Sequence, residues 1–221
     1  MGSTAIKRRN RPRRADGLQT RQRVLRVAAK AFATSGYQGT SLRQIATAAA
    51  VDLATLKYHF GTKPELFSDV YRGGHTALFA MLSPLIRDLS ESQSVDGLAK
   101  ALHAQLYEVG DYLEANEDWV RMTVFRLLEL PSELTPVEDQ LQDQMLSALE
   151  QCLAHLVKRE LIRPVDTKAL VIMLLTALPT WYLCAQVRPA WMKISEKEGG
   201  LQESFVSFFT DALHQFLLPI A

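Results

Sequence analysis

The sequence predicts an all-α protein with about nine or ten helices. Apolar residues recur at three- and four-residue spacings along most of its 221 residues, and no segment shows the sustained alternation of a half-buried strand. Capping residues and Gly or Pro breakers separate the apolar segments. Because 48% of the residues are apolar, the chain can also bury a sizeable core.

Charge divides the chain into a basic and an acidic part. Residues 1–63 hold 13 Lys and Arg but two acidic residues, whereas residues 64–221 hold 12 Lys and Arg and 22 acidic residues. The stretch 1–17 is rich in arginine, contains Pro12 and has no apolar period, which predicts a disordered basic arm. A chain polarised in this way indicates that its basic part meets a polyanion.

The helical pattern of the basic part begins at Leu18, and Gly36 stands at the position of the first C-cap. Ser41 then starts a short helix with a capping box, and Asp52 is a good N-cap for a second one. Alanines between them allow the two helices to approach closely. Residues 41–60 are therefore predicted to form a helix-turn-helix.

The acidic part is predicted to be a separate helical domain. We place the first domain at residues 18–78, so that the second covers residues 79–221. Breakers and N-caps divide the second domain into a string of apolar helices. Its landmarks are a restart at Ser83-Pro84, a loop from Pro131 to Pro136, and long final helices at about 166–188 and 201–217.

The sequence also argues against several classes of protein. The histidines are scattered and no catalytic, phosphate-binding or metal-ligand motif occurs, so we expect no enzyme activity, no cofactor and no metal. Cys152 and Cys184 stand in apolar segments, which favours core residues of a cytoplasmic protein over a disulfide or a zinc site. Thr and Pro interrupt the uncharged stretch 169–187, which favours a buried helix or a subunit interface over a membrane span.

Residues 20–71 closely resemble the N-terminal domain of the TetR (tetracycline-repressor) family. The matching text is TRQRVLRVAAKAFATSGYQGTSLRQIATAAAVDLATLKYHFGTKPELFSDVY. The resemblance implies a homodimeric transcriptional regulator, usually a repressor, with three N-terminal helices that bind DNA. It also implies a divergent C-terminal helical domain that binds a small molecule and dimerises. The family usually has Gly where Ala50 stands, Ser where Asp52 stands and Tyr where Lys57 stands.

The second helix of the helix-turn-helix is expected to read base edges in the major groove. The resemblance also implies contacts with the DNA backbone. They come from residues at the start of the first helix of the helix-turn-helix and from a lysine at the N-terminus of the helix that follows it. Two plainer interpretations stay open: Thr40, Ser41 and Thr62 serve only as caps, and Tyr58 only as core. The base-reading set is Leu53, Ala54, Thr55, Lys57, Tyr58 and His59, and the backbone set is Thr40, Ser41, Arg43 and Lys63.

The acidic domain is expected to dimerise and to bind a ligand, as the resemblance implies. Its last two helices would pack against their symmetry mates, which sets two recognition helices roughly 34–36 Å apart on a pseudo-palindromic operator. A hydrophobic or aromatic effector would occupy a mostly apolar cavity and favour a spacing that no longer matches the operator. Candidate cavity residues, each of which could equally be plain core, are Phe79, Leu106, Tyr107, Trp119, Met122, Phe125, Met145, Met173, Thr176, Trp181 and Tyr182.

These observations predict a cytoplasmic, sequence-specific DNA-binding regulator, and more specifically a repressor that a small molecule releases from its operator. An architectural or cell-division DNA-binding protein of the same fold, which needs no effector, is the alternative. The arginines of the arm either enter the adjacent minor groove or add salt-sensitive, nonspecific affinity, and we favour the second role. The sequence identifies neither the operator nor the effector.

Overall fold

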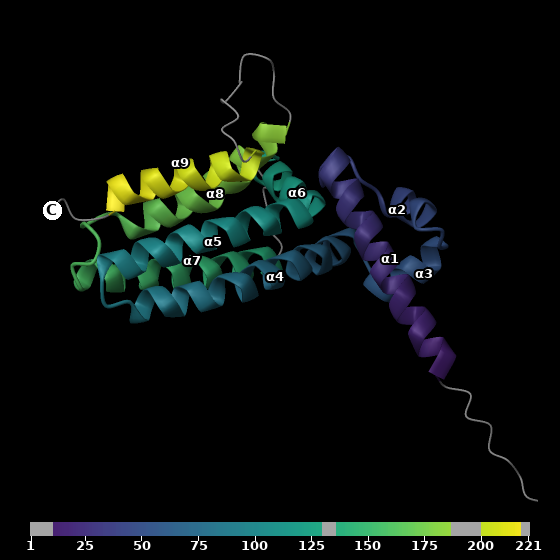
Figure 1. The fold of residues 1–221 in the computed structure, drawn as a ribbon. Helices are drawn as coiled ribbons and strands as arrows, with labels where there is room; N and C mark the ends of the chain where they lie inside the picture. Colours follow the sequence, from purple (N-terminus) through teal and green to yellow (C-terminus); the bar gives the residue numbers. More distant parts are fainter. Residues whose placement is uncertain (1–10, 130–135, 187–199, 218–221) are drawn as a thin grey trace, which may run out of the picture.

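The computed structural model describes residues 11–129, 136–186 and 200–217, and within these ranges it contains helices and no strand (Figure 1). The predicted all-α class is confirmed, and the nine helices of the described ranges agree with the predicted count. They are α1 (Arg11–Ser35), α2 (Leu42–Ala48), α3 (Leu53–Phe60), α4 (Lys63–Glu91), α5 (Val95–Ala115), α6 (Glu117–Leu128), α7 (Pro136–Lys158), α8 (Thr167–Gln186) and α9 (Gly200–Leu217).

Helices α1 to α3 and the first turns of α4 form the head, an N-terminal unit with its own apolar core (Figure 1). Phe32, Leu56 and Phe67 lie fully buried at its centre. The rings of Phe32 and Phe67 pack edge to face with centroids 5.0 Å apart, which joins α1 to α4. An ion pair adds to this contact, because Arg21 Nη2 lies 2.6 Å from Asp69 Oδ2.

Helix α1 starts at Arg11, so the disordered arm predicted for residues 1–17 is wrong for residues 11–17, while residues 1–10 lie outside the described ranges. The prediction failed because these arginines and Pro12 show no apolar period. Arginine nevertheless has a high helix propensity, and proline is tolerated in a first helical turn. A helix already anchored by the buried Val24 and Phe32 therefore extends toward its N-terminus at little cost per residue.

Helix α4 runs from the head into the rest of the molecule without a break (Figure 1). The restart predicted at Ser83-Pro84 is wrong, and the predicted domain boundary at residue 78 falls inside this helix. Leu82 and Leu89, on either side of the proline, are buried in the same core, and this packing maintains the helix. Pro84 itself is exposed, where water can replace the backbone hydrogen bond that proline removes.

Most of α4 and helices α5 to α9 form the body, a helical bundle with a second apolar core (Figure 1). The last two helices lie close to their predicted ranges. Asp166 caps α8, because the Ala169 N–H donates to Asp166 Oδ1 over 2.9 Å. Of the loop predicted from Pro131 to Pro136, residues 131–135 lie outside the described ranges, and Pro136 is already the first residue of α7.

Helix α8 is apolar and yet largely uncovered. Its window Thr167–Cys184 is long and apolar enough to cross a membrane by length and composition alone, and 17% of the window is buried in this chain. Core helices of soluble proteins pass the same test, so a single such helix is weak evidence. Ile172 and Met173 are 47% and 52% exposed, and Cys184 is exposed too, unlike the buried Cys152. The prediction that Cys184 is a core residue is wrong, because the described residues leave this apolar face uncovered.

Candidate nucleic-acid interface and internal cavity

Side-chain caps determine where the two helices of the helix-turn-helix begin. At α2, the Gln44 N–H donates to Ser41 Oγ over 3.3 Å, and the Ser41 N–H donates to Gln44 Oε1 over 2.8 Å. At α3, the Thr55 N–H donates to Asp52 Oδ1 over 2.6 Å. This bond and one from the Thr55 hydroxyl favour the charged carboxylate, so they lower the pKa of Asp52. As a result, α2 and α3 both lie within the predicted range 41–60.

The turn between α2 and α3 contains a strained residue. Ala50 has a φ of 50°, in the left-handed region where a Cβ costs roughly 1–2 kcal/mol. Hydrogen bonds on both sides stabilise the turn: the Val51 N–H donates to the Ala46 carbonyl over 3.0 Å, and Arg23 Nε donates to the Ala49 carbonyl over 2.9 Å. A glycine at this position would lack the strain.

Replacing Ala50 by glycine is expected to raise the free energy of unfolding by about 0.5–1 kcal/mol. The change removes the left-handed strain, and the greater backbone entropy of glycine in the unfolded chain offsets part of the gain. Ala48→Gly is the matched control, because Ala48 is helical and exposed, so that glycine there should destabilise by up to about 1 kcal/mol. Chemical denaturation measures the change in the free energy of unfolding for both variants. A destabilised Ala50→Gly variant would contradict the strain argument.

Helix α3 presents one outward face. Leu56 and Phe60 are buried and anchor the helix to the head, whereas Ala54, Lys57 and Tyr58 are exposed. The side chain of Tyr58 is 86% exposed, so its interpretation as core is wrong. The other members of the predicted base-reading set, Leu53, Thr55 and His59, are half-buried. The outward face therefore combines a cation, a phenol and a methyl group, which are types that contact phosphates and base edges.

The residues predicted to contact the DNA backbone lie in different surroundings. Arg43 is exposed on α2, and Ser41 is exposed although its hydroxyl takes part in the capping box. Thr40 is 4% exposed, and its hydroxyl donates to the Gly36 carbonyl over 2.7 Å. The hydroxyl of Thr40 thus holds the loop before α2, and a contact of Thr40 with the DNA backbone stays a prediction.

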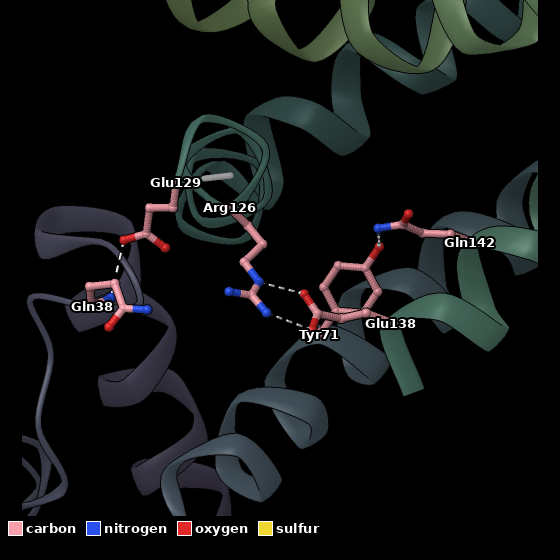
Figure 2. Close-up of polar contacts among 6 residues, drawn as sticks. All are labelled: Gln38, Tyr71, Arg126, Glu129, Glu138 and Gln142. Carbon is pink, nitrogen blue, oxygen red and sulfur yellow. Dashed lines mark hydrogen bonds and ion pairs between the residues drawn. The ribbon is translucent and has the colours of Figure 1, made fainter. Parts of the chain in front are cut away.

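The C-terminal end of α6 joins the body to the head through Arg126. Its Nε lies 2.8 Å from Glu138 Oε1 and its Nη2 3.2 Å from Glu138 Oε2 (Figure 2). The two side chains are 6% and 0% exposed. The guanidinium also lies 4.8 Å from the ring centroid of Tyr37 and 5.3 Å from that of Phe67, which both belong to the head. One buried ion pair thus contacts both units.

A second contact crosses this junction at Glu129, the residue after α6. The Gln38 N–H donates to Glu129 Oε1 over 3.1 Å (Figure 2). Gly36 lies so close that a Cβ on it would be 2.3 Å from the same oxygen, and its φ of 69° also favours glycine. Lys63 Nζ lies 4.3 Å from the Tyr37 ring centroid, and burial lowers the pKa of this amine, while the charge of Glu129 opposes that shift. The amine of Lys63 thus lies near the junction, and its phosphate contact stays a prediction.

A cavity of about 470 Å³ lies between α4, α5, α6, α7 and α8 of the body, and the exposed residues Leu127 and Ile172 form part of its lining. Its volume falls in the range of about 300–1,000 Å³ that is typical of small-molecule sites, and leucine is the commonest residue of its mostly apolar wall. Leu106, Trp119, Met145 and Thr176 of the predicted set line it. Sequence reasoning missed the polar residues of the lining, which are Tyr71, His75, Gln105, Tyr112, Thr123, Arg126 and Gln142.

The other seven predicted cavity residues lie elsewhere. Met122 is buried in the core of the head, Met173 is exposed, and the Tyr107 hydroxyl donates to Glu203 Oε2 over 2.6 Å. Their place in the predicted set is corrected, because helical spacing identifies an apolar face without showing which neighbour covers it. The remaining four, which pack outside the cavity lining, are Phe79, Phe125, Trp181 and Tyr182.

Comparison with known proteins relates the head to one family. Residues 24–70 match the sequence model of the bacterial regulatory proteins, tetR family. The chain is similar to the HTH-type transcriptional regulator AcrR of Shigella flexneri, with 38% identity over 61 residues that cover 28% of each chain. It is also similar to IcaR of Staphylococcus epidermidis, the HTH-type negative transcriptional regulator of the biofilm operon icaADBC. That similarity is 22% identity over 89% of this chain and 96% of the relative.

The fold of most of the chain is shared with a solved structure. The structure of AibR in complex with isovaleryl coenzyme A and operator DNA is similar with a TM-score of 0.58 and 19% identity, covering 91% of this chain and 100% of that one. The chain spans about a quarter of AcrR but nearly all of IcaR and AibR. Sequence similarity is therefore strongest in the head, and the likeness of the body is one of fold.

Proposed function

Because the chain belongs to the TetR family and is a DNA-binding transcriptional regulator, we propose that it is a repressor that a small apolar effector releases from its operator. The outward face of α3 supports this most directly, since Lys57 and the 86% exposed Tyr58 lie outside the core of the head. The name of IcaR, which is similar over most of the chain, describes a negative regulator. The proteins named in these matches are regulators of transcription rather than enzymes.

The repressor acts as a homodimer through α8 and α9. Ile172 and Met173 on α8 and Phe208 on α9 are 47%, 52% and 58% exposed, which is high for large apolar side chains. A two-fold contact between such faces buries them and places two copies of α3 on successive turns of the same DNA groove. The operator is accordingly pseudo-palindromic.

The effector acts through the residue that the cavity shares with the junction. Arg126 lines the cavity, and its guanidinium also contacts the rings of Tyr37 and Phe67 in the head. A ligand that fits the cavity better in one arrangement of α6 than in another shifts the population toward that arrangement, and the head moves with it. Release of DNA then follows from the ligand's difference in affinity for the two states.

A mobility-shift assay with the DNA upstream of the protein's own gene tests the proposed function. The fragment should be retarded at protein concentrations that leave a random duplex unbound, and a reporter gene behind it should be transcribed less when the protein is present. Genome-wide occupancy separates the alternative function, because a repressor occupies few promoters whereas an architectural protein occupies many dispersed sites. Dispersed occupancy without promoter preference would overturn the repressor assignment.

Deleting residues 1–14 should flatten the salt dependence of DNA binding. The segment carries six Lys and Arg, and each phosphate contact contributes about 0.9 to the slope of log K against log salt concentration. If all six contact phosphates, the slope falls in magnitude by about 5 for each subunit. Fluorescence polarisation over a salt series measures this change. An unchanged slope would exclude the segment from the interface.

A further inference from the structure

The polar side chains that line the cavity are satisfied within the chain, with one exception. The Tyr112 hydroxyl donates to the Gly74 carbonyl over 2.7 Å, and the Tyr71 hydroxyl accepts from Gln142 Nε2 over 3.1 Å (Figure 2). His75 is 2% exposed, and its Nε2 has no hydrogen-bond partner among the described residues. Hydrogen bonds within the chain are also made by Gln105, Trp119, Thr123, Arg126 and Thr176.

The surroundings of His75 leave Nε2 as an acceptor. Burial lowers the pKa of His75, which favours the neutral imidazole, and an interaction of the ring with the backbone carbonyl of Leu141 opposes that shift. A carbonyl only accepts hydrogen bonds and Nε2 has no partner, so this interaction favours the tautomer in which Nδ1 carries the proton and Nε2 is an acceptor. The ring lies nearly parallel to that of Tyr71, with centroids 5.9 Å apart. A buried acceptor without a partner raises the free energy of the protein, and a donor that enters the cavity relieves this.

The cavity favours an uncharged ligand. With His75 neutral, Arg126 is the charged residue of the lining. Its guanidinium is paired with the buried Glu138 carboxylate and lies against the rings of Tyr37 and Phe67. An anionic ligand would have to compete with that carboxylate, and a cationic one would face Arg126 without a carboxylate in the lining. Both kinds of charge would be desolvated without adequate compensation.

We propose that the cavity binds an uncharged, apolar molecule with one hydrogen-bond donor, such as a phenol or an alcohol, and that this donor bonds to His75 Nε2. The inference rests on the proposed function, because it names the chemical class of the effector for the same site. It also distinguishes this cavity from one built for an acyl-coenzyme A, the class of ligand bound by AibR, whose phosphate groups carry several negative charges.

Three probes that share one apolar body and differ at one substituent test the proposal: 4-phenylphenol, 4-methoxybiphenyl and biphenyl-4-carboxylate. Calorimetric titration of the full chain at neutral pH, without DNA, compares their affinities. The phenol should bind about tenfold more tightly than the ether, which cannot donate, and the carboxylate should bind most weakly. Equal affinity of phenol and ether, tightest binding of the carboxylate, or no binding of any probe would overturn the proposal.

A variant and a spectrum assign the preference to His75. In His75→Phe, which keeps an aromatic ring but removes Nε2, the phenol should lose its tenfold advantage while the ether still binds. Because a substitution at the buried His75 can itself unfold the chain, the unmodified protein provides a second readout. Its His75 ¹⁵Nε2 resonance should shift when the phenol binds and stay nearly unchanged with the ether. A resonance that responds equally to both probes would contradict the assignment.

Failure of this inference and failure of the proposed function give different results, because neither the titration nor the spectrum involves DNA. If the upstream fragment is bound but phenol and ether bind equally, the ligand class is wrong and the repressor function stands. If the phenol is preferred but no DNA fragment is, the cavity chemistry stands and the repressor function is wrong.

Discussion

Replacing Glu138 by alanine is expected to lower the free energy of unfolding by about 3–5 kcal/mol. The substitution leaves the Arg126 guanidinium, which is 6% exposed, without the carboxylate that neutralises it, and removing one partner of a buried ion pair has an effect of this size. In a chain of 221 residues this corresponds to a fall of roughly 6–20 °C in the Tm. Denaturant titration and thermal unfolding measure the two quantities.

Two companion variants isolate the effect of the buried charge. Asp143→Ala removes an exposed carboxylate from the same helix and should change stability by less than about 0.5 kcal/mol. The double variant Arg126→Met/Glu138→Leu removes both charges and should recover most of the lost stability. If Glu138→Ala proved as mild as Asp143→Ala, this ion pair would not be what holds the junction between head and body.

Replacing Tyr58 by alanine should produce the largest loss of operator affinity among single changes on α3. A base-edge contact contributes about 1–3 kcal/mol, and a dimer makes it twice, so the expected loss is about 2–6 kcal/mol. This is a factor on the order of 30 to 10⁴ in Kd. Stability should stay the same, since the side chain is 86% exposed. Fluorescence polarisation with the upstream fragment and with a random duplex measures the loss of specificity.

Lys57→Ala is the matched comparison on the same face of α3. A lysine that contacts phosphate carries no sequence information, so its loss should weaken binding to operator and random duplex by similar factors. The salt slope should also fall by about 0.9 for each lysine removed from the interface. If Tyr58→Ala weakened both duplexes equally, Tyr58 would be a backbone contact and not a reader of bases.

The recognition element of the head could be predicted because its signals are local. Ser41 and Asp52 cap their helices through bonds to residues three positions along the chain, and such spacing is visible in the sequence. The family usually has glycine where Ala50 stands, and the φ of Ala50 lies in the left-handed region that favours glycine. The exposure of Tyr58 could not be predicted in this way, because an aromatic residue on a short helix fits the core equally well.

The cavity and the junction could be predicted only in part, because they depend on contacts between distant helices. A helical period shows that Met122 and Met145 are on apolar faces, yet one lies in the head and the other lines the cavity. Arg126 stands among apolar residues of α6, but Glu138 belongs to the acidic first turn of α7, where a solvent-exposed carboxylate is equally expected, so the burial of this pair had no local signal. His75 had none, since a lone histidine in an apolar helix is most often a satisfied core residue.

The central claim is that the outward face of α3 reads an operator. The most direct test compares the Kd of the purified protein for the DNA upstream of its own gene with its Kd for a random duplex, at an ionic strength of about 0.15 M. The account predicts a lower Kd for the fragment by on the order of 10³ or more in the DNA-binding state, and loss of most of this ratio in Tyr58→Ala. Equal affinity for both duplexes, with and without the phenol probe, would contradict it.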